Sequence, residues 1–227
     1  MTSIINGKRV SGSPNEIREV QNAFNAYDMI ETLNPLSIED LLKAHHYMMD
    51  GLIKGNGEFR CSGICITNGN QIIQHIAPPA ELVPGLIADL FQWYRESSLH
   101  VLIKSAIFHY EFEFIHPFSD GNGRIGRMRH SMLLGAWREL FYWLPIEDLI
   151  RQRQKEYYDA LGTSDREGNS TEFIKLMLEI IRDSIRELEL PLRTETNSDI
   201  SDSIQRLLNA LGHETLGSSG ILMGLER

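Results

Sequence analysis

Cysteine is scarce in this chain of 227 residues, which contains only Cys61 and Cys65. Two cysteines are too few for the disulfide scaffold of a small secreted domain. No second pair of Cys or His residues follows them at the intervals of a zinc finger. We therefore expect two free thiols and a chain that works in the reducing cytoplasm.

Long apolar runs are also missing. No stretch approaches the ~20 apolar residues that cross a membrane, and the first residues, MTSIINGKRVSG, lack the apolar core of a signal peptide. Positive charge is in deficit, because 22 Lys and Arg stand against 31 Asp and Glu, a formal net charge of −9. Neither a membrane nor nucleic acid is expected as a partner, although Arg124, Arg127 and Arg129 form a local basic cluster.

The chain does contain enough apolar material for a core, since 42% of its residues are hydrophobic. Apolar residues recur at helical spacing over most of the sequence, which predicts helices over 14–34, 37–48, from about 83, 99–114, 124–140, 147–162 and 170–189. Two short isoleucine-rich runs flank NGN at residues 68–70, a turn signal that predicts a β-hairpin. The expected fold is mainly α, a helical bundle with one hairpin.

Three parts are expected along the chain. Residues 1–34 form an N-terminal helical segment, residues 35–190 form the core, and residues 191–227 form a linker and a partial helical segment. The sequence RTETNSD at residues 193–199 has the composition of a linker. The segment from residue 200 to the end is too short to bury a core of its own.

Residues 116–127, HPFSDGNGRIGR, allow two incompatible interpretations. One is the dinucleotide-binding pattern GxGxxG, formed by Gly121, Gly123 and Gly126 after the alternating, strand-like sequence YEFEFI. However, that pattern should follow a strand directly, whereas HPFSD intervenes here, and Asp120 adds negative charge where a pyrophosphate would approach. The chain also lacks the strand–helix alternation of a doubly wound sheet. The dinucleotide interpretation is therefore disfavoured.

The other interpretation is a phosphate site at the start of a helix. A helix beginning near Asn122 or Gly123 presents unpaired N–H groups and the positive end of its dipole to an anion. Arg124 and Arg127 lie three positions apart, so they share a helix face on which two guanidinium groups can hold a polyphosphate.

Three side chains precede that helix. Asp120 can supply an oxygen ligand to Mg²⁺. His116 is the group that can accept a proton from an attacking hydroxyl near neutral pH. Phe118 offers no such chemistry and is expected to anchor the loop. Each residue alone is ordinary, and their conjunction within twelve positions indicates phosphate chemistry.

HPFSDGNGRIGR matches the signature of the Fic family, His-x-Phe-x-Asp/Glu-Gly-Asn-Gly-Arg-x-x-Arg, at every specified position. The chain resembles this family from about Thr2 to Leu190, with GEFR (57–60), HIAPP (75–79) and EYYDAL (156–161) in the family's order. The resemblance implies a Fic-type helical core. It also implies Mg²⁺-dependent transfer of AMP from ATP to a Ser, Thr or Tyr hydroxyl of a target protein, self-modification included.

The resemblance also implies roles for individual residues. His116 would be the general base and Asp120 the Mg²⁺ ligand. The phosphates of ATP would bind Asp120, Gly121, Asn122, Gly123, Arg124, Ile125, Gly126 and Arg127. Tyr157 and Asp165 would line the adenine pocket, although some relatives have asparagine at the second of these positions. The hairpin would be a flap that aligns the target by strand pairing, with its working edge at Ile72, Ile73, Gln74 and His75.

The N-terminal residues TSIING resemble the family's self-inhibiting pattern, Ser/Thr-x-x-x-Glu-Gly/Asn. Asn6 occupies the position of the inhibitory glutamate. Because an amide cannot neutralise Arg127 as a carboxylate does, the resemblance implies an enzyme released from autoinhibition. It leaves AMP removal open, since in some relatives that reaction depends on the glutamate.

Two alternatives to AMP transfer remain. The site could transfer another phosphate-linked group, because the helix N-terminus with Arg124 and Arg127 recognises phosphates and not the base. It could also bind a nucleotide as a regulatory module without turnover. The final segment vaguely resembles the first helices of a winged-helix module, but it is too short to predict DNA binding. Self-association through the helical faces is compatible with the sequence.

Overall fold

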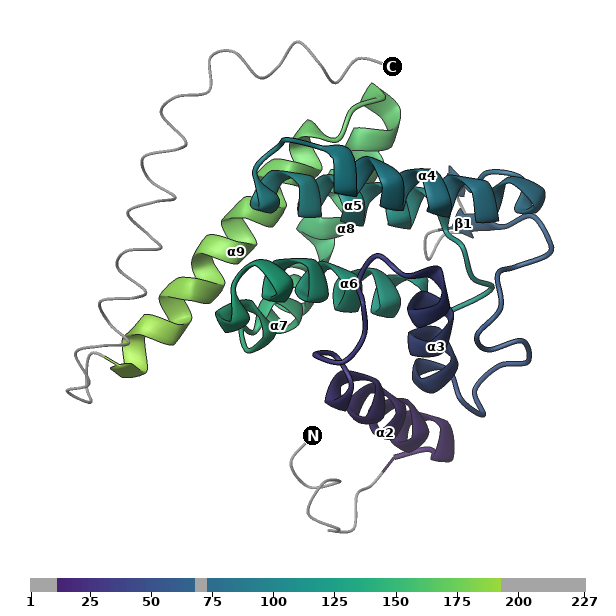
Figure 1. The fold of residues 1–227 in the computed structure, drawn as a ribbon, viewed down its shortest axis with the longest axis horizontal. Helices are drawn as coiled ribbons and strands as arrows, with labels where there is room; N and C mark the ends of the chain where they lie inside the picture. Colours follow the sequence, from purple (N-terminus) through teal and green to yellow (C-terminus); the bar gives the residue numbers. More distant parts are fainter. Residues whose placement is uncertain (1–11, 68–72, 193–227) are drawn as a thin grey trace. The chain divides into compact units, whose positions relative to one another are not determined.

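The computed structural model describes residues 12–67 and 73–192, and nearly all of its elements are helices (Figure 1). In chain order they are α2 (Pro14–Asp28), α3 (Ile38–Met48), β1 (Cys65–Thr67), β2 (Ile73–Ile76), η1 (Ala80–Leu82), α4 (Val83–Glu96), α5 (Val101–Ile115), α6 (Asn122–Trp137), η2 (Glu139–Tyr142), α7 (Ile146–Gln152), α8 (Gln154–Glu167) and α9 (Thr171–Leu192). The expectation of a mainly α fold with one β-hairpin is confirmed.

The chain divides into two compact units, the first ending at Tyr142 and the second beginning at Trp143. The sequence-based boundaries near residues 34 and 190 stay predictions. The expected linker and partial helical segment lie outside the described residues from residue 193 onward. In the part of the chain that is described, no helix has the length and apolar character needed to cross a membrane.

Helix α2 begins with a capping box. The Ser13 hydroxyl accepts from the Glu16 N–H over 3.3 Å, and the Glu16 carboxylate accepts from the Ser13 N–H over 2.8 Å. The helix ends at Asp28, well short of the predicted residue 34. Beyond it, both the N–H and the hydroxyl of Thr32 donate to the Met29 carbonyl. Such local hydrogen bonds compete with those of a helix.

Helix α3 carries the apolar stripe that the sequence predicted. Ser37 caps it by accepting from the Asp40 N–H over 3.2 Å, while the Asp40 carboxylate accepts from the Asn34 N–H over 2.9 Å. The stripe is buried and consists of Leu41, Ala44, His45 and Met48. His45 is the polar member of this stripe, and a buried polar group needs hydrogen-bond partners.

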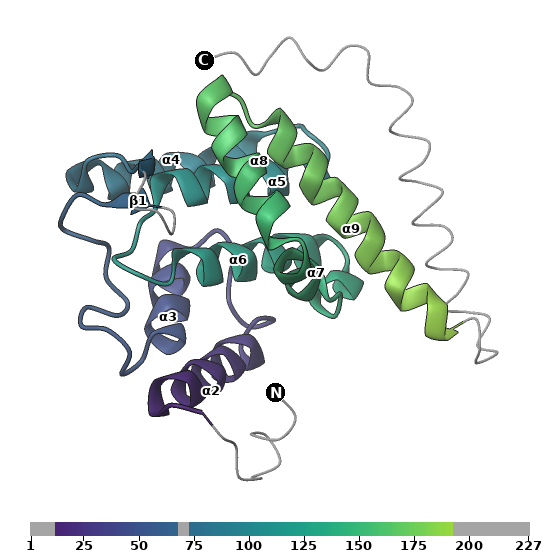
Figure 2. The same cartoon turned by 180° about the vertical axis from the view of Figure 1, so that it is seen from behind.

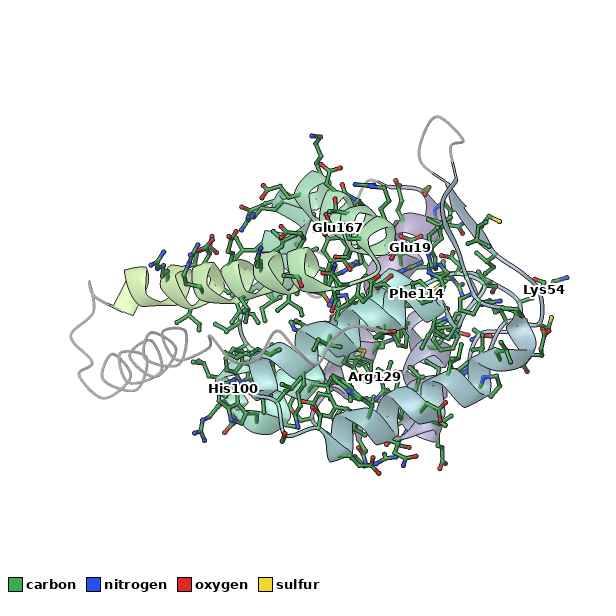
Figure 3. The ribbon with its side chains drawn as sticks, turned by 90° about the horizontal axis from the view of Figure 1, so that it is seen from above. Glu19, Lys54, His100, Phe114, Arg129 and Glu167 are labelled. Atoms are coloured by element: carbon green, nitrogen blue, oxygen red, sulfur yellow. The ribbon has the colours of Figure 1, made fainter. Side chains whose placement is uncertain are left out.

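Helix α5 contacts both α4 and α6 (Figure 1). Because it packs on two sides, most of its side chains are buried and it lacks a polar face. In Figure 3, His100 and Phe114 mark its two ends. The alternating sequence YEFEFI is thus helical and not a strand, which removes the strand required for a dinucleotide fingerprint.

The predicted hairpin is present as the antiparallel pair β1 and β2, with Cys65 opposite Ile76 and Ile66 opposite His75. Its turn, at residues 68–72, lies outside the described residues. His75 attaches β2 to α5, because its Nε2 lies 2.7 Å from the Phe114 carbonyl oxygen and its ring contacts the Phe114 ring. The hairpin is therefore seated at the C-terminal end of α5.

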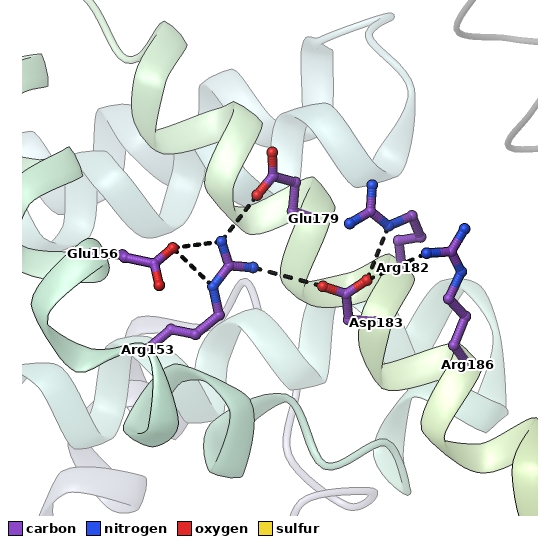
Figure 4. A network of polar contacts seen from close by, with 6 residues as sticks. All are labelled: Arg153, Glu156, Glu179, Arg182, Asp183 and Arg186. Atoms are coloured by element: carbon purple, nitrogen blue, oxygen red, sulfur yellow. Dashed lines mark hydrogen bonds and ion pairs between the residues drawn. The ribbon is translucent and has the colours of Figure 1, made fainter.

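The second unit contains α7, α8 and α9, and α9 contacts both α7 and α8 (Figure 2). The sequence predicted one helix over residues 147–162, but the chain breaks at Arg153 into α7 and α8. The Arg153 guanidinium bonds the carboxylates of Glu156 and Glu179 over 2.6 and 2.9 Å and lies 3.6 Å from that of Asp183 (Figure 4). The side chains of these ion pairs are partly exposed to solvent.

Candidate active site

Helix α6 begins at Asn122, as the sequence predicted. No side chain caps its N-terminus, and its first internal hydrogen bond runs from the Ile125 N–H to the Gly121 carbonyl over 3.0 Å. The N–H groups of Asn122, Gly123 and Arg124 therefore have no partner within the helix, at the positive end of its dipole. This end of α6 can bind an anion such as a phosphate.

Glycine is required at position 121 for two reasons. Its φ is +83°, a left-handed conformation that other residues adopt at a cost. A Cβ there would also lie 2.6 Å from the sulfur of Met49, which is fully buried. Met49 thus limits the size of the residue that precedes helix α6.

The basic cluster of the site contains two arginines and not the three that the sequence suggested. Arg124 and Arg127 are partly exposed. Arg124 lies 3.9 Å from the Asp120 carboxylate, and Arg127 forms no ion pair within the described ranges. Arg129 is fully buried, and its guanidinium donates to the Asn34 carbonyl over 2.9 Å. Burial lowers the pKa of Arg129 to about 9.

His116 ends helix α5 in the left-handed conformation, with φ 50° and ψ 62°. It is the only non-glycine residue with positive φ in the described part of the chain. Its Nδ1 lies 3.3 Å from the Glu113 carbonyl oxygen, and because a carbonyl only accepts, Nδ1 carries the proton and Nε2 keeps its lone pair. Burial lowers the pKa of His116, partly opposed by Glu113. The ring is therefore a neutral base near pH 7.

Asp120 is exposed, and one oxygen of its carboxylate accepts from the Gly121 N–H over 2.6 Å. The described residues contain no group of three or more His, Cys, Asp or Glu side chains that could hold a metal ion. A cation at Asp120 would therefore need phosphate and water oxygens as its other ligands, which is how Mg²⁺ commonly binds beside a nucleotide.

Three other residues of the predicted phosphate site, Asn122, Ile125 and Gly126, are buried and support the loop and helix that form it. The buried Asn122 side chain accepts from the Phe118 N–H and donates to the Phe118 carbonyl, both over 2.8 Å, so the side chain is used within the loop and is not left to bind an anion. Ile125 lies in the hydrophobic core. Gly126 is buried against α5, where a Cβ would lie 2.4 Å from the Glu113 carboxylate. Gly126 thus allows the close packing of α5 and α6.

His45 is a site residue to which the sequence assigned no role. Its Nδ1 accepts from the Gly57 N–H over 2.8 Å, so its Nε2 carries the proton and donates to the Asp120 carbonyl over 3.0 Å. Its ring stacks on Phe118 at 3.7 Å, and Phe118 is fully buried, as predicted for the anchor of the loop. The available signal was a histidine on an apolar stripe, since such a residue needs buried partners.

Arg60 was also without an assigned role. It is 5% exposed, and its Nε donates to the His116 carbonyl over 2.7 Å. The sequence identified it only as the last residue of GEFR. A buried arginine with backbone partners has no signature in composition or spacing.

The remaining predicted residues are spread over the chain. Ile73, Gln74 and His75 lie on β2, whereas Ile72 and Asn6 lie outside the described residues. In the second unit, α8 carries Tyr157 and Asp165. Tyr157 is 2% exposed and packs against Phe173, with ring centroids 5.4 Å apart, and Asp165 is partly buried. Their assignment to an adenine pocket stays a prediction.

Fold and site together define a helical domain in which a loop that starts at a neutral histidine, His116, leads to an uncapped helix N-terminus that can bind an anion. Residues 35–134 match the sequence model of the Fic/DOC family. This segment is therefore a domain of the Fic/DOC family, and the resemblance found in the sequence is confirmed.

Known relatives agree with this assignment. A probable protein adenylyltransferase from Aquifex aeolicus is 34% identical over 120 residues, covering 44% of this chain and 38% of its own length. Protein adenylyltransferase Fic from Drosophila willistoni is 29% identical over 182 residues, covering 76% of this chain and 32% of its own length. This chain thus spans about a third of these curated relatives.

A solved Fic family protein from Desulfovibrio desulfuricans is 44% identical to this chain. Its structure superimposes with a TM-score of 0.80 over 88% of this chain and 61% of its own. A Fic-1 structure from C. elegans, 21% identical, has a TM-score of 0.64 and shows the same fold over 94% of this chain and 58% of its own.

Proposed function

We propose that this chain transfers AMP from ATP to a Ser, Thr or Tyr hydroxyl of a protein, with Mg²⁺ bound beside the phosphates. The observation that carries the proposal is the neutral His116 ring on the loop that leads into the uncapped N-terminus of α6. The loop that joins them is held by Asn122 on Phe118. The names of the curated relatives support the same reaction.

In this reaction the N–H groups at the start of α6 bind phosphate oxygens, and Arg124 and Arg127 hold the outer phosphates. Asp120 is the protein ligand of Mg²⁺, which neutralises phosphate charge when it is bound. The Nε2 atom of His116 takes the proton of the attacking hydroxyl. A bond then forms from that oxygen to the α-phosphorus, the bond to the β-phosphate oxygen breaks, and pyrophosphate leaves.

The remaining features of the proposal depend on the family resemblance. The working edge proposed for the flap, at Ile72, Ile73, Gln74 and His75, aligns a target segment by strand pairing, and Tyr157 and Asp165 receive the adenine. The target can be another protein or a second copy of this chain. Two exposed free cysteines fit a reducing, cytoplasmic location.

Autoinhibition is weak in the proposed enzyme. Asn6 occupies the position at which relatives carry an inhibitory glutamate, and an amide cannot neutralise a guanidinium. Arg127 forms no ion pair within the described residues, so it is available to the outermost phosphate of ATP.

Labelled ATP tests the proposal. The purified chain is incubated with a cell lysate, Mg²⁺ and ATP labelled on the α-phosphate or, in parallel, on the γ-phosphate. We expect α-label on protein, its absence in His116→Ala, and its retention in His46→Ala, which changes the exposed neighbour of His45. Transfer of γ-label would indicate phosphoryl transfer instead. Binding of ATP without transfer to any protein would indicate a regulatory module.

A further inference from the structure

Arg60 lies where three segments of the first unit meet. Its guanidinium donates to four backbone carbonyls, those of His116 (2.7 Å), Ser62 (2.9 Å), Pro78 (2.5 Å) and Ile115 (3.3 Å). Two of these carbonyls end helix α5, one precedes β1, and one follows β2. The backbone N–H of Arg60 also donates to the Pro117 carbonyl over 2.9 Å.

We propose that Arg60 is a positioning residue that holds His116 and the base of the β-hairpin in one fixed geometry. This inference rests on the proposed function and deepens it. In it, Arg60 sets the distance between the hairpin edge that binds the target and the general base His116. Arg60 itself contacts neither ATP nor the attacking hydroxyl in this scheme.

The chemistry of the contact suits arginine and not lysine. A guanidinium has five N–H donors in a planar fork, so it can reach carbonyls that approach from different directions. Lysine has the same charge, but its three donors radiate from a single nitrogen. The carbonyls of Ile115 and His116 also lie at the negative end of the α5 dipole, where a cation is stabilised.

On the side of the base, Arg60 supports an unusual backbone. His116 has positive φ, and its peptide is held by the Phe112 carbonyl at its N–H and by Arg60 at its own carbonyl. With Nδ1 on the Glu113 carbonyl, these contacts fix where Nε2 points. Loss of the Arg60 contact frees the carbonyl of His116 and lets the ring move.

On the side of the hairpin, Arg60 bonds the residues that flank the two strands. Ser62 precedes β1 and Pro78 follows β2, and between them the Ala77 N–H donates to the Ile64 carbonyl over 3.1 Å. The guanidinium therefore joins the two ends of the hairpin to each other and to the end of α5. Movement of the hairpin and movement of His116 are coupled through this one side chain.

The variant Arg60→Lys separates charge from geometry. We expect a fall of about 100-fold in kcat for transfer to a target, the size of effect that a displacement of about 1 Å produces in an active site. KM for the target rises, because the hairpin edge is displaced. KM for ATP stays near the wild-type value, because Arg60 does not contact the N-terminus of α6.

Two measurements do not depend on transfer. Hydrogen exchange at the Ala77 amide should be faster in Arg60→Lys, and the ring ¹⁵N signals of His116 should broaden or shift. Burial is the main cause that lowers the pKa of His116, Glu113 opposes it, and the charges of His75 and Arg60 lower it further. In Arg60→Gln the charge of Arg60 is lost, so this pKa should rise by that smaller contribution. Arg129→Lys is the matched control, since Arg129 is a buried arginine that also donates to backbone carbonyls.

Arg129→Lys should lose stability but leave the Ala77 amide and the His116 ring unchanged. All variants are measured at a temperature at which circular dichroism shows the wild-type helical signal. An Arg60→Lys protein with wild-type Ala77 exchange and His116 signals would overturn the inference, as would a failure of this variant to fold at any temperature. If the wild type transfers no label, the proposed function fails, and the exchange and ring signals still decide the role of Arg60.

Discussion

The His45 ring bridges the Gly57 N–H and the Asp120 carbonyl, with distances of 2.8 Å to Nδ1 and 3.0 Å to Nε2. The same ring stacks on Phe118, with 4° between the ring planes. One neutral, fully buried histidine thus joins helix α3 to the loop that carries the proposed metal ligand. Both ring nitrogens are used, so neither the protonated form nor the other tautomer can keep both bonds.

Replacing His45 by alanine should lower the free energy of unfolding by about 2–4 kcal/mol, because it removes a stacked buried ring and leaves buried backbone groups unpaired. Urea unfolding followed by circular dichroism measures this loss. His46→Ala, at the exposed neighbouring position, should stay within about 0.5 kcal/mol of the wild type. Equal effects at the two positions would contradict the role of His45.

Stability should fall as the pH is lowered below about 6.5. Burial lowers the pKa of His45 and His130 in the folded state, so the unfolded chain binds more protons between the folded pKa and the ordinary value of 6.5. The stabilisation that these neutral, buried rings provide is complete above pH 6.5 and is lost as the pH falls from 6.5 to the folded-state pKa. In this range the free energy of unfolding falls by up to about 1.4 kcal/mol per pH unit for each histidine.

Urea midpoints measured at pH 7.5, 6.5 and 5.5 test this dependence. In His45→Asn the slope should be smaller than in the wild type by the contribution of one histidine. A stability that does not change over this range would show that these rings protonate in the folded state as they do in water.

The rate of transfer should resist mild acid. Burial lowers the pKa of His116, so a larger share of its Nε2 is unprotonated at pH 6.5 than in an ordinary histidine, which is about half protonated there. The pH profile of kcat/KM measures the pKa of the base in the free enzyme. We expect kcat/KM to decline in acid with a midpoint below pH 6.5. A midpoint above 6.5 would be inconsistent with a base that is buried in this way.

Gly121→Ala should destabilise the fold by about 2–5 kcal/mol. A left-handed backbone costs a non-glycine residue about 1–2 kcal/mol, and overpacking against the buried Met49 sulfur adds about 1–3 kcal/mol. Gly168→Ala is the control, because Gly168 has φ +66° but no atom within 4 Å of its added Cβ. Each variant shifts the urea midpoint from that of the wild type, and the difference between the two shifts isolates the contact with Met49. Equal shifts would show that the Met49 side chain moves aside.

Asn6→Glu should reduce AMP transfer, because a carboxylate at this position would pair with Arg127 and displace the outermost phosphate. Asn6→Gln, which is equally long but neutral, should remain active. Transfer from α-labelled ATP under identical conditions compares the two variants. Unchanged activity in Asn6→Glu would sink the idea that Asn6 marks a released inhibitory contact.

Features that depend on short stretches of sequence were predictable. The turn signal NGN predicted the hairpin, and the glycines around Asn122 predicted where α6 begins. Phe118 was expected to anchor the loop because it is a large apolar residue among polar ones, and it is fully buried. In each case the physical cause lies within a few residues, so the sequence contains it.

Features that depend on competition between contacts were not predictable. Apolar spacing continued past Asp28, but local hydrogen bonds of Thr32 ended the helix. Periodicity gave no sign of the break at Arg153. Arg129 is an arginine like Arg124 and Arg127, but it is buried and donates a hydrogen bond to the Asn34 carbonyl. Residue type does not indicate which side of a helix the rest of the chain covers.

The sequence by itself determined which chemical groups are present, in which order, and the helix start that places backbone N–H groups beside two arginines. Only the tertiary structure decided how they are held. His45 reaches the loop from 75 positions away and Arg60 reaches His116 from 56 positions away. Both bind backbone carbonyls, which every residue has. Such contacts leave no pattern in a sequence, because their partners are brought together by packing and not by side-chain identity.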